Sequence, residues 1–183
     1  MTIAKTSKEP LHCLEGRGSR PSLSENPKAL LAFFVFNIII KLMRTNNKIQ
    51  VIVFNKKEDE ILFLILKTIP KKDSFWQPIT GGVEEGETFE EAAIREIGEE
   101  IGIKNNVKLI DVDYSFDFMR EGKEQHEKVF GAEVPSESNI IISEEHVEYK
   151  WVRGEDAINN YLKWDSNKLG FKKLIELLNS ANH

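Results

Sequence analysis

A short acidic segment constrains this chain more than any other feature of its sequence. Residues 84–100 contain eight glutamates and one arginine, a net charge of −7, whereas the whole chain of 183 residues has a net charge of −5. Thr88 and Glu91, three residues apart, match the pattern of a capping box, and Gly102 suits the C-terminal end of a helix. We therefore predict a helix over residues 88–101 whose two ends are specified locally.

The faces of this helix follow from a rotation of roughly 100° per residue. One apolar stripe is expected to be buried. It consists of Ala93, Ile94, Ile97 and Ile101. Glu96, Glu99 and Glu100 lie on an adjacent face at helical spacing, so their carboxylates converge and repel one another. An acidic face of this kind is often simply solvated, but hard divalent cations also favour carboxylate oxygens. The helix alone leaves both interpretations open.

The spacing of the residues around the helix favours the second interpretation. Gly81 is followed after five residues by Glu87, and Glu87 is followed after seven residues by the run REIGEEIGI, residues 95–103. This pattern is similar at every fixed position to the Nudix box, G-x5-E-x7-R-E-U-x-E-E-x-G-U, in which U is an aliphatic residue. The chain resembles the Nudix hydrolases over roughly residues 46–180.

The resemblance implies a fold, a reaction and a set of site residues. Nudix hydrolases have an α/β/α sandwich with a mixed sheet and a loop–helix–loop catalytic motif. They hydrolyse a nucleoside diphosphate linked to another group and use Mg²⁺ or Mn²⁺. By position, Glu96, Glu99 and Glu100 match the metal ligands, and the last two are candidates for the general base. By the same match, four further residues are expected to support the site and to orient its glutamates. They are Gly81, Glu87, Arg95 and Gly102.

Three segments that overlap or flank the spacing pattern resemble one particular group of Nudix hydrolases. They are FWQPITGGVEEGET at residues 75–88, EHVEYKW at residues 145–151 and WDSN at residues 164–167. Their order and spacing are similar to those of the dihydroneopterin triphosphate pyrophosphatases, also called dATP pyrophosphohydrolases. By that match, Glu145 is expected to be a further metal ligand or base, and Trp76 and Gln77 are expected to contact the substrate. For Trp76, a position in the core is the competing interpretation to stacking on a pterin or purine ring.

The resemblance implies a pyrophosphohydrolase with a nucleoside or pterin triphosphate as its substrate, such as dihydroneopterin triphosphate or dATP. It would cleave between the α and β phosphates and release a monophosphate and pyrophosphate. In one alternative the same chemistry acts on ADP-ribose, a dinucleoside polyphosphate or an oxidised nucleotide. In another the domain is a non-catalytic nucleotide sensor, although such proteins usually lose box glutamates and this chain keeps them all.

Composition excludes several other classes of protein. The net charge argues against a general nucleic-acid binder, which is normally basic. Cys13 is the only cysteine, so an intramolecular disulfide and a zinc ribbon are excluded. His126 and His146 are expected to be structural or surface residues, since the glutamates already satisfy a hard metal. We expect a cytoplasmic enzyme with a small-molecule substrate, and the sequence leaves its oligomeric state open.

The rest of the chain from Lys48 onward is typical of an α/β unit. Residues 50–54 and 61–66 are apolar and flank a polar turn, which predicts a hairpin. Further strands are predicted at residues 107–118, 129–134 and 149–152. Further helices are predicted at residues 155–162 and 167–178. Residues 120–127 are highly charged and predict a loop.

The N-terminal part, residues 1–45, differs from the domain predicted over residues 46–183. Residues 1–28 lack apolar periodicity and are expected to be disordered. The apolar run 29–40 is too short to cross a bilayer as a helix. Three interpretations stay open: an extra helix on the domain, a natural start at Met43, and a membrane anchor or export signal. We expect no stable membrane association unless this run is a genuine anchor.

Overall fold

The computed structural model describes residues 46–57, 60–70 and 74–181. The predicted N-terminal extension, residues 1–45, lies outside the described part, so its three interpretations stay predictions. Within the described part, no helix combines the length and the apolar character that crossing a membrane requires.

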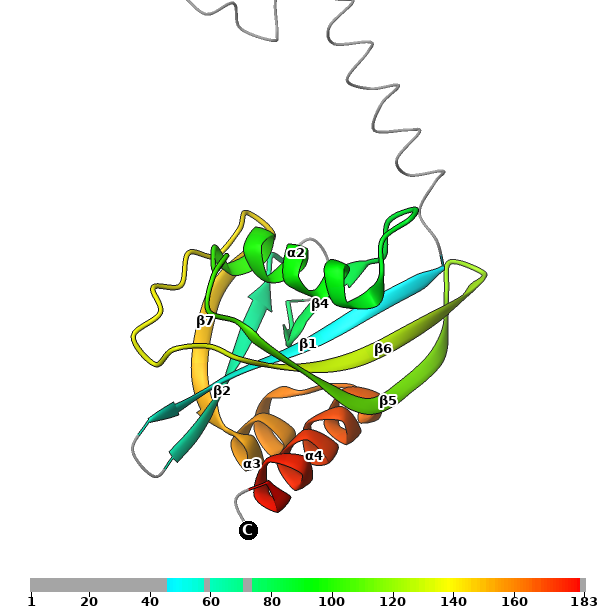
Figure 1. Ribbon diagram of the computed structural model, residues 1–183. Coiled ribbons are helices and arrows are strands. Elements are labelled where there is room, and N and C mark those ends of the chain that lie inside the picture. Colours follow the sequence, from blue (N-terminus) through cyan, green and yellow to red (C-terminus); the bar gives the residue numbers. More distant parts are fainter. Residues whose placement is uncertain (1–45, 58–59, 71–73, 182–183) are drawn as a thin grey trace, which may run out of the picture. The chain divides into compact units, whose positions relative to one another are not determined.

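The described residues form a mixed seven-stranded sheet with helices on both of its faces (Figure 1). The strands are β1 (Asn47–Lys57), β2 (Glu60–Thr68), β3 (Trp76–Gln77), β4 (Ile79–Gly82), β5 (Lys108–Arg120), β6 (Lys123–Glu133) and β7 (His146–Arg153). The helices are α2 (Phe89–Ile101), α3 (Gly154–Asp156), a π-helical turn (Ala157–Tyr161) and α4 (Asp165–Ser180). β1 pairs in parallel with β6, and antiparallel with β2 and β4. The predicted α/β fold with a mixed sheet and helices on both faces is confirmed.

The central strand β1 explains why helices cover both faces of the sheet. Residues 49–55 are all buried, as expected for a strand that is covered on both sides. Because successive side chains point to opposite faces, Val51 and Val53 pack in the layer that contains α2. Ile52 and Phe54 pack in the opposite layer, which contains α4. Figure 1 shows α2 in green above the sheet and α3 and α4 in orange and red below it.

Both ends of α2 form as the sequence predicts. The backbone N–H of Glu91 donates to Thr88 Oγ1 at 3.1 Å, and the carboxylate of Glu91 accepts from the backbone N–H of Thr88 at 2.9 Å. Gly102 ends the helix with φ 76°, and its N–H donates to the carbonyl of Gly98. A left-handed residue at this position is readily supplied by glycine, so the local sequence alone fixes where the helix stops.

The buried stripe of α2 is rotated from the predicted one. Ile94, which we expected to be buried, is 38% exposed, whereas Ala92 is fully buried. Ala92 lies on the same row of the helix as Glu96 and Glu100, at spacings of four residues. Turning this row toward the sheet turns Ile94 outward, and it brings two of the glutamates against the edge of β4.

The predicted loop at residues 120–127 is wrong, because most of this segment is strand. β5 continues to Arg120 and pairs with β6 from Lys123 onward. Only Glu121 and Gly122 form the turn, with φ values of 54° and 76°. Two left-handed residues are typical of a tight hairpin turn, but Glu-Gly is a weaker signal for it than Asn-Gly. The charged side chains concealed the strand, because they show no alternation of apolar and polar residues.

Candidate active site

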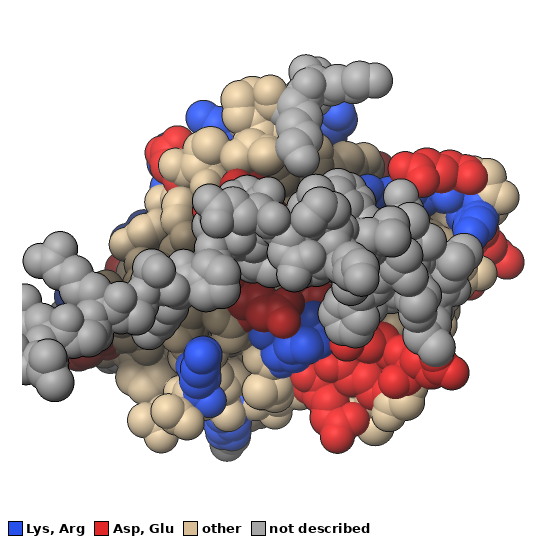
Figure 2. All heavy atoms as spheres, turned by 90° about the horizontal axis from the view of Figure 1, so that it is seen from above, with Lys and Arg blue, Asp and Glu red and all other residues tan. Residues whose placement is uncertain are grey.

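A cavity of about 970 Å³ lies where the N-terminal half of β1, β4, α2 and the segment before β7 come together. All four glutamates that the sequence predicts as metal ligands line it: Glu96, Glu99, Glu100 and Glu145. Gly81 and Arg95 line the same cavity. Figure 2, seen from the α2 side, shows acidic side chains grouped together with Lys and Arg side chains beside them. The fold therefore brings Glu145 to the helix from a distant part of the chain.

Arg95 connects the parts of this site. Its Nε and Nη2 donate to the two carboxylate oxygens of Glu87 at 2.8 and 3.0 Å, and Nη2 also donates to the carbonyl of Gly82 at 2.8 Å. Its Nη1 donates to Glu96 Oε1 at 2.8 Å and to Glu99 Oε2 at 3.2 Å. The hydrogen bonds from Arg95 lower the pKa of Glu87, and Glu87 in turn is the main cause that raises the pKa of Arg95. The guanidinium thus stays charged and holds two of the predicted ligands.

Gly81 makes room for Glu96. A Cβ atom on Gly81 would lie 2.0 Å from the Cδ of Glu96, far closer than two carbon atoms can approach. The Glu96 side chain is only 13% exposed. The pKa of Glu96 is raised to about 6, mainly by burial and also by the neighbouring charges of Glu100 and Glu99, against the opposing effect of Arg95. The negative charge of this carboxylate is therefore only partly compensated by the protein.

Glu100 and His146 form a buried pair that the sequence did not reveal. His146 Nε2 lies 2.9 Å from Glu100 Oε2, and the two side chains are 2% and 8% exposed. Burial raises the pKa of Glu100, while its hydrogen bond to His146 opposes the shift. The available signal was the position of His146 directly after Glu145. Sequence alone could not pair it with a helix residue 46 positions away.

The carboxylates suit a hard divalent cation, although they are not arranged around one. In the described part of the chain, no three Asp, Glu, His or Cys side chains lie close enough together to hold a metal ion. Arg95 holds oxygens of Glu96 and Glu99, and His146 holds one of Glu100. The donors are nevertheless all carboxylate oxygens, which Mg²⁺ prefers. The raised pKa values of Glu96 and Glu100 indicate negative charge that a cation would offset.

Trp76 and Gln77, both predicted to contact the substrate, have different surroundings. Gln77 lines the cavity of the glutamates, whereas Trp76 does not. The Trp76 ring packs edge-on against Tyr161 at 5.5 Å and contacts the core layer of α4. Adjacent residues of a strand point to opposite sides, so the two side chains separate. This packing favours the core interpretation of Trp76, and its contact with the substrate stays a prediction.

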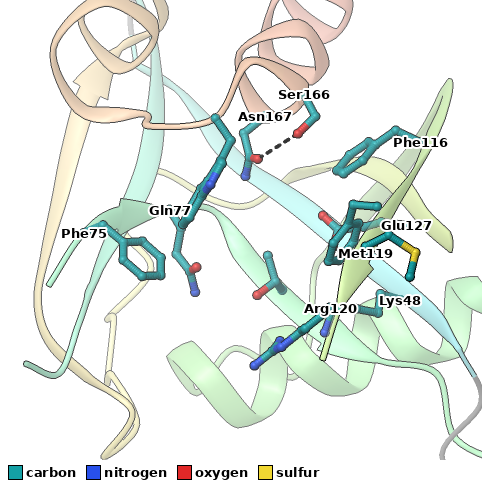
Figure 3. A pocket seen from close by; sticks show the side chains of 12 residues that line it. Lys48, Phe75, Gln77, Phe116, Met119, Arg120, Glu127, Ser166 and Asn167 are labelled. Atoms are coloured by element: carbon teal, nitrogen blue, oxygen red, sulfur yellow. Dashed lines mark hydrogen bonds between the residues drawn. The ribbon is translucent and has the colours of Figure 1, made fainter. Parts of the chain in front are cut away.

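A second cavity, of about 510 Å³, adjoins the first and was missed by sequence reasoning (Figure 3). The two cavities share five lining residues: Lys48, Phe75, Gln77, Thr80 and Arg120. The aromatic rings of the second cavity are those of Phe75, Phe116, Phe118 and Trp164. Its other polar residues are Glu127, Ser166 and Asn167. Met119, Arg120 and Glu127 line it from β5 and β6. These residues lie outside the strands that the sequence predicts, so they could not be placed before the length of the hairpin was known.

Comparison with known proteins identifies relatives of the whole domain. A family model for the NUDIX domain matches residues 45–174. The dihydroneopterin triphosphate diphosphatase of Escherichia coli is 29% identical over 148 residues, which cover 74% of this chain and 95% of that protein. An Ap4A hydrolase of Caenorhabditis elegans, solved as a binary complex, superposes with a TM-score of 0.65 at 26% identity, over 73% of this chain and 98% of its own.

A third relative is similar over a part of its length only. An octanoyltransferase of Myxococcus xanthus is 32% identical over 114 residues, which cover 60% of this chain but 30% of that protein. The match covers less than a third of the octanoyltransferase. The name of that protein therefore does not describe the matched region in particular.

Proposed function

The chain belongs to the Nudix family of hydrolases, and we propose that it hydrolyses a pterin or nucleoside triphosphate between the α and β phosphates. The products are a monophosphate and pyrophosphate. The observation that carries the proposal is the cavity lined by Glu96, Glu99, Glu100 and Glu145, which continues into a second cavity lined by aromatic rings. The first suits a metal-bound phosphate chain and the second suits a flat ring.

The glutamates of the first cavity would hold Mg²⁺ or Mn²⁺. When bound, such an ion offsets the charge of the phosphates and lowers the pKa of an attacking water. Arg95 keeps Glu96 and Glu99 in place, and its own position is fixed by Glu87 and the carbonyl of Gly82. These hydrogen bonds fix Glu96 and Glu99 relative to the loop before α2, which limits the motion of the two carboxylates.

We assign the general base to Glu99 or Glu100, and exposure favours Glu99. The Glu99 side chain is 61% exposed and accepts a hydrogen bond from Arg95 with one of its oxygens, so its other oxygen can reach a water in the cavity. Glu100 is buried, and one of its oxygens is bonded to His146. A general base must lie within hydrogen-bond reach of the proton that it accepts, and Glu99 has more freedom to do so.

The phosphate chain of the substrate would pass Lys48 and Arg120, which line both cavities. Their positive charges attract an anion that the glutamates alone would repel. Similarity to the Escherichia coli dihydroneopterin triphosphate diphosphatase supports a pterin or nucleoside triphosphate. Similarity to the Ap4A hydrolase of Caenorhabditis elegans supports a second candidate, a dinucleoside polyphosphate. Cytoplasmic location remains a prediction.

The full chain incubated with a panel of substrates in Mg²⁺ and in Mn²⁺ tests the proposal. The panel contains dihydroneopterin triphosphate, the four deoxynucleoside triphosphates, diadenosine tetraphosphate and ADP-ribose, with the products separated by ion-exchange chromatography. We expect pyrophosphate and a monophosphate from a triphosphate. Cleavage of diadenosine tetraphosphate alone supports the second candidate. Binding without turnover of any compound overturns the enzymatic proposal and favours a nucleotide sensor.

A further inference from the structure

The second cavity contains a buried carboxylate that the proposed reaction does not use. Glu127 lies on β6 opposite Lys48 of β1, lines the cavity and is only 4% exposed. Figure 3 shows it on the opposite side of the cavity from Phe75 and Gln77. Lys48 and Arg120 are near enough to lower its pKa, which nevertheless stays above the ordinary value.

A carboxylate in this position is costly for the protein by itself. Burial raises the pKa of Glu127 to about 7, and the two cations oppose this shift only in part. A buried charge that its neighbours compensate only in part destabilises a fold. Because the carboxylate lines a cavity, a ligand that donates hydrogen bonds to it there would stabilise its negative charge.

The walls of the cavity indicate the shape of that ligand. The ring centroids of Phe75 and Trp164 lie 4.6 Å apart in an edge-on contact, and those of Phe116 and Phe118 on β5 lie 5.9 Å apart with the rings tilted by 38°. Flat aromatic walls favour a planar ring system. Asn167 adds an amide that is mostly buried, at the start of α4. A heteroaromatic ring therefore fits the cavity, with Glu127 at one edge of the ring.

We propose that Glu127 binds the 2-amino-4-oxo edge of a pterin or guanine ring and so selects these rings over adenine. This edge presents two adjacent donors, a ring N–H and an exocyclic amino group, and a carboxylate accepts both at once. The corresponding edge of adenine presents one donor beside one acceptor, which a carboxylate matches only in part. The inference rests on the proposed function, since it names the ring of that substrate.

The position of Glu127 relative to the glutamate site suits one substrate that spans both cavities. In the sheet, Gly82 of β4 pairs with Lys48 of β1, and Lys48 pairs with Glu127 of β6. Adjacent strands are about 4.8 Å apart, so the backbones of Gly82 and Glu127 are separated by roughly 10 Å. Gly82 is directly tied to Arg95 of the glutamate site. A sugar or a short side chain between ring and phosphates bridges a gap of this size.

Substitution of Glu127 by glutamine gives the sharpest test. Glutamine has nearly the same shape but presents one donor and one acceptor, which matches adenine instead. We expect the full-length wild type to prefer dGTP and dihydroneopterin triphosphate over dATP in kcat/KM. Glu127→Gln should lower kcat/KM for the first two by about 10- to 100-fold and leave dATP unchanged or improved, as expected for one bidentate contact. Glu124→Gln, an exposed change on the same strand, should alter neither.

A binding measurement separates failure of this inference from failure of the proposed function. Titration calorimetry with dGMP and dAMP needs no turnover, and we expect wild type to bind dGMP more tightly. Equal affinities of the wild type for dGMP and dAMP would overturn the inference. So would a ratio of kcat/KM for dGTP to kcat/KM for dATP that Glu127→Gln leaves unchanged. Absence of hydrolysis with retained preference for dGMP overturns only the proposed function.

A second variant guards against the case in which glutamine disturbs folding. Glu127→Asp keeps the charge but withdraws the carboxylate by one carbon. It should weaken dGMP binding without any gain for dAMP, whereas an unchanged affinity for dGMP would contradict the proposed contact.

Discussion

Arg95 donates hydrogen bonds to both carboxylate oxygens of Glu87, at 2.8 and 3.0 Å, while its remaining nitrogen donates to Glu96 and Glu99. Glu87 lies in the loop before α2 and the other three residues lie in the helix. The pair therefore locks the loop to the helix, and it sets the positions of two predicted metal ligands through one guanidinium.

Removing the charge of Glu87 tests this coupling. Glu87→Gln should lower kcat by about 10- to 100-fold, because Arg95 is no longer held and Glu96 and Glu99 lose their positions. Steady-state kinetics measure the effect. Arg95→Gln and the double variant Glu87→Gln/Arg95→Gln should show about the same loss in kcat, because the effects of substitutions within one hydrogen-bond network are not additive. Glu85→Gln, an exposed change in the same loop, serves as the control, and an equal loss there would argue against a specific role.

Alanine substitutions at the adjacent residues Gly81 and Gly82 form a matched test of the position of Glu96. Gly81→Ala places a methyl group 2.0 Å from Glu96 Cδ, so the carboxylate must move, and we expect kcat to fall by about 10²-fold. A Cβ on Gly82 meets nothing within 4 Å, so Gly82→Ala should keep nearly full activity. Similar activity in the two variants would show that the position of Glu96 is unimportant.

Substituting Glu99 separates chemistry from stability. As the proposed base and ligand, Glu99→Gln should lose about 10²- to 10⁴-fold in kcat. Its side chain is 61% exposed, so the midpoint of thermal unfolding should change by no more than a few degrees. Glu90→Gln on the same helix is the exposed control. An active Glu99→Gln enzyme would refute the role given to this residue.

Stability should depend on pH through Glu127. Burial raises its pKa to about 7 from an ordinary 4.5, so between these values the folded chain binds more protons than the unfolded chain. The free energy of unfolding then falls as the pH rises through this window, and the contribution is fully present below about pH 4.5. Glu127→Gln removes this effect and should stabilise the protein at about pH 8 by on the order of 1–3 kcal/mol.

Urea unfolding of wild type and Glu127→Gln at about pH 5 and about pH 8 measures this difference. Most of the gain should disappear at the lower pH, where Glu127 is already neutral in the folded state. A gain of the same size at both values would mean that the carboxylate does not titrate between them.

Removal of divalent cations tests the metal site by stability as well as by activity. EDTA should abolish turnover, and Mg²⁺ or Mn²⁺ should restore it. Because an ion that binds only the folded chain stabilises it, the cation should also raise the unfolding midpoint. Glu96→Gln should reduce this rise, whereas Glu90→Gln should leave it intact. A rise that is equal in both variants would place the cation elsewhere.

Much of the site could be predicted because its specification is local. The capping box of Thr88 and Glu91 and the left-handed Gly102 fix the length of α2. The helix then sets the spacing of Glu96, Glu99 and Glu100 without help from the rest of the chain. Side chains three and four positions apart in a helix are always neighbours, so a pattern in the sequence is directly a pattern in space.

What the sequence by itself determined is thus helix α2, the hairpin of β1 and β2 and the family of the chain. The tertiary structure decided the rotation that exposes Ile94, the pairing of Glu100 with His146, and the cavity that Glu127 lines. These features depend on which strands lie side by side and which face a helix presents to them. Such contacts join residues far apart in the chain, and local propensity carries no information about the distance between them.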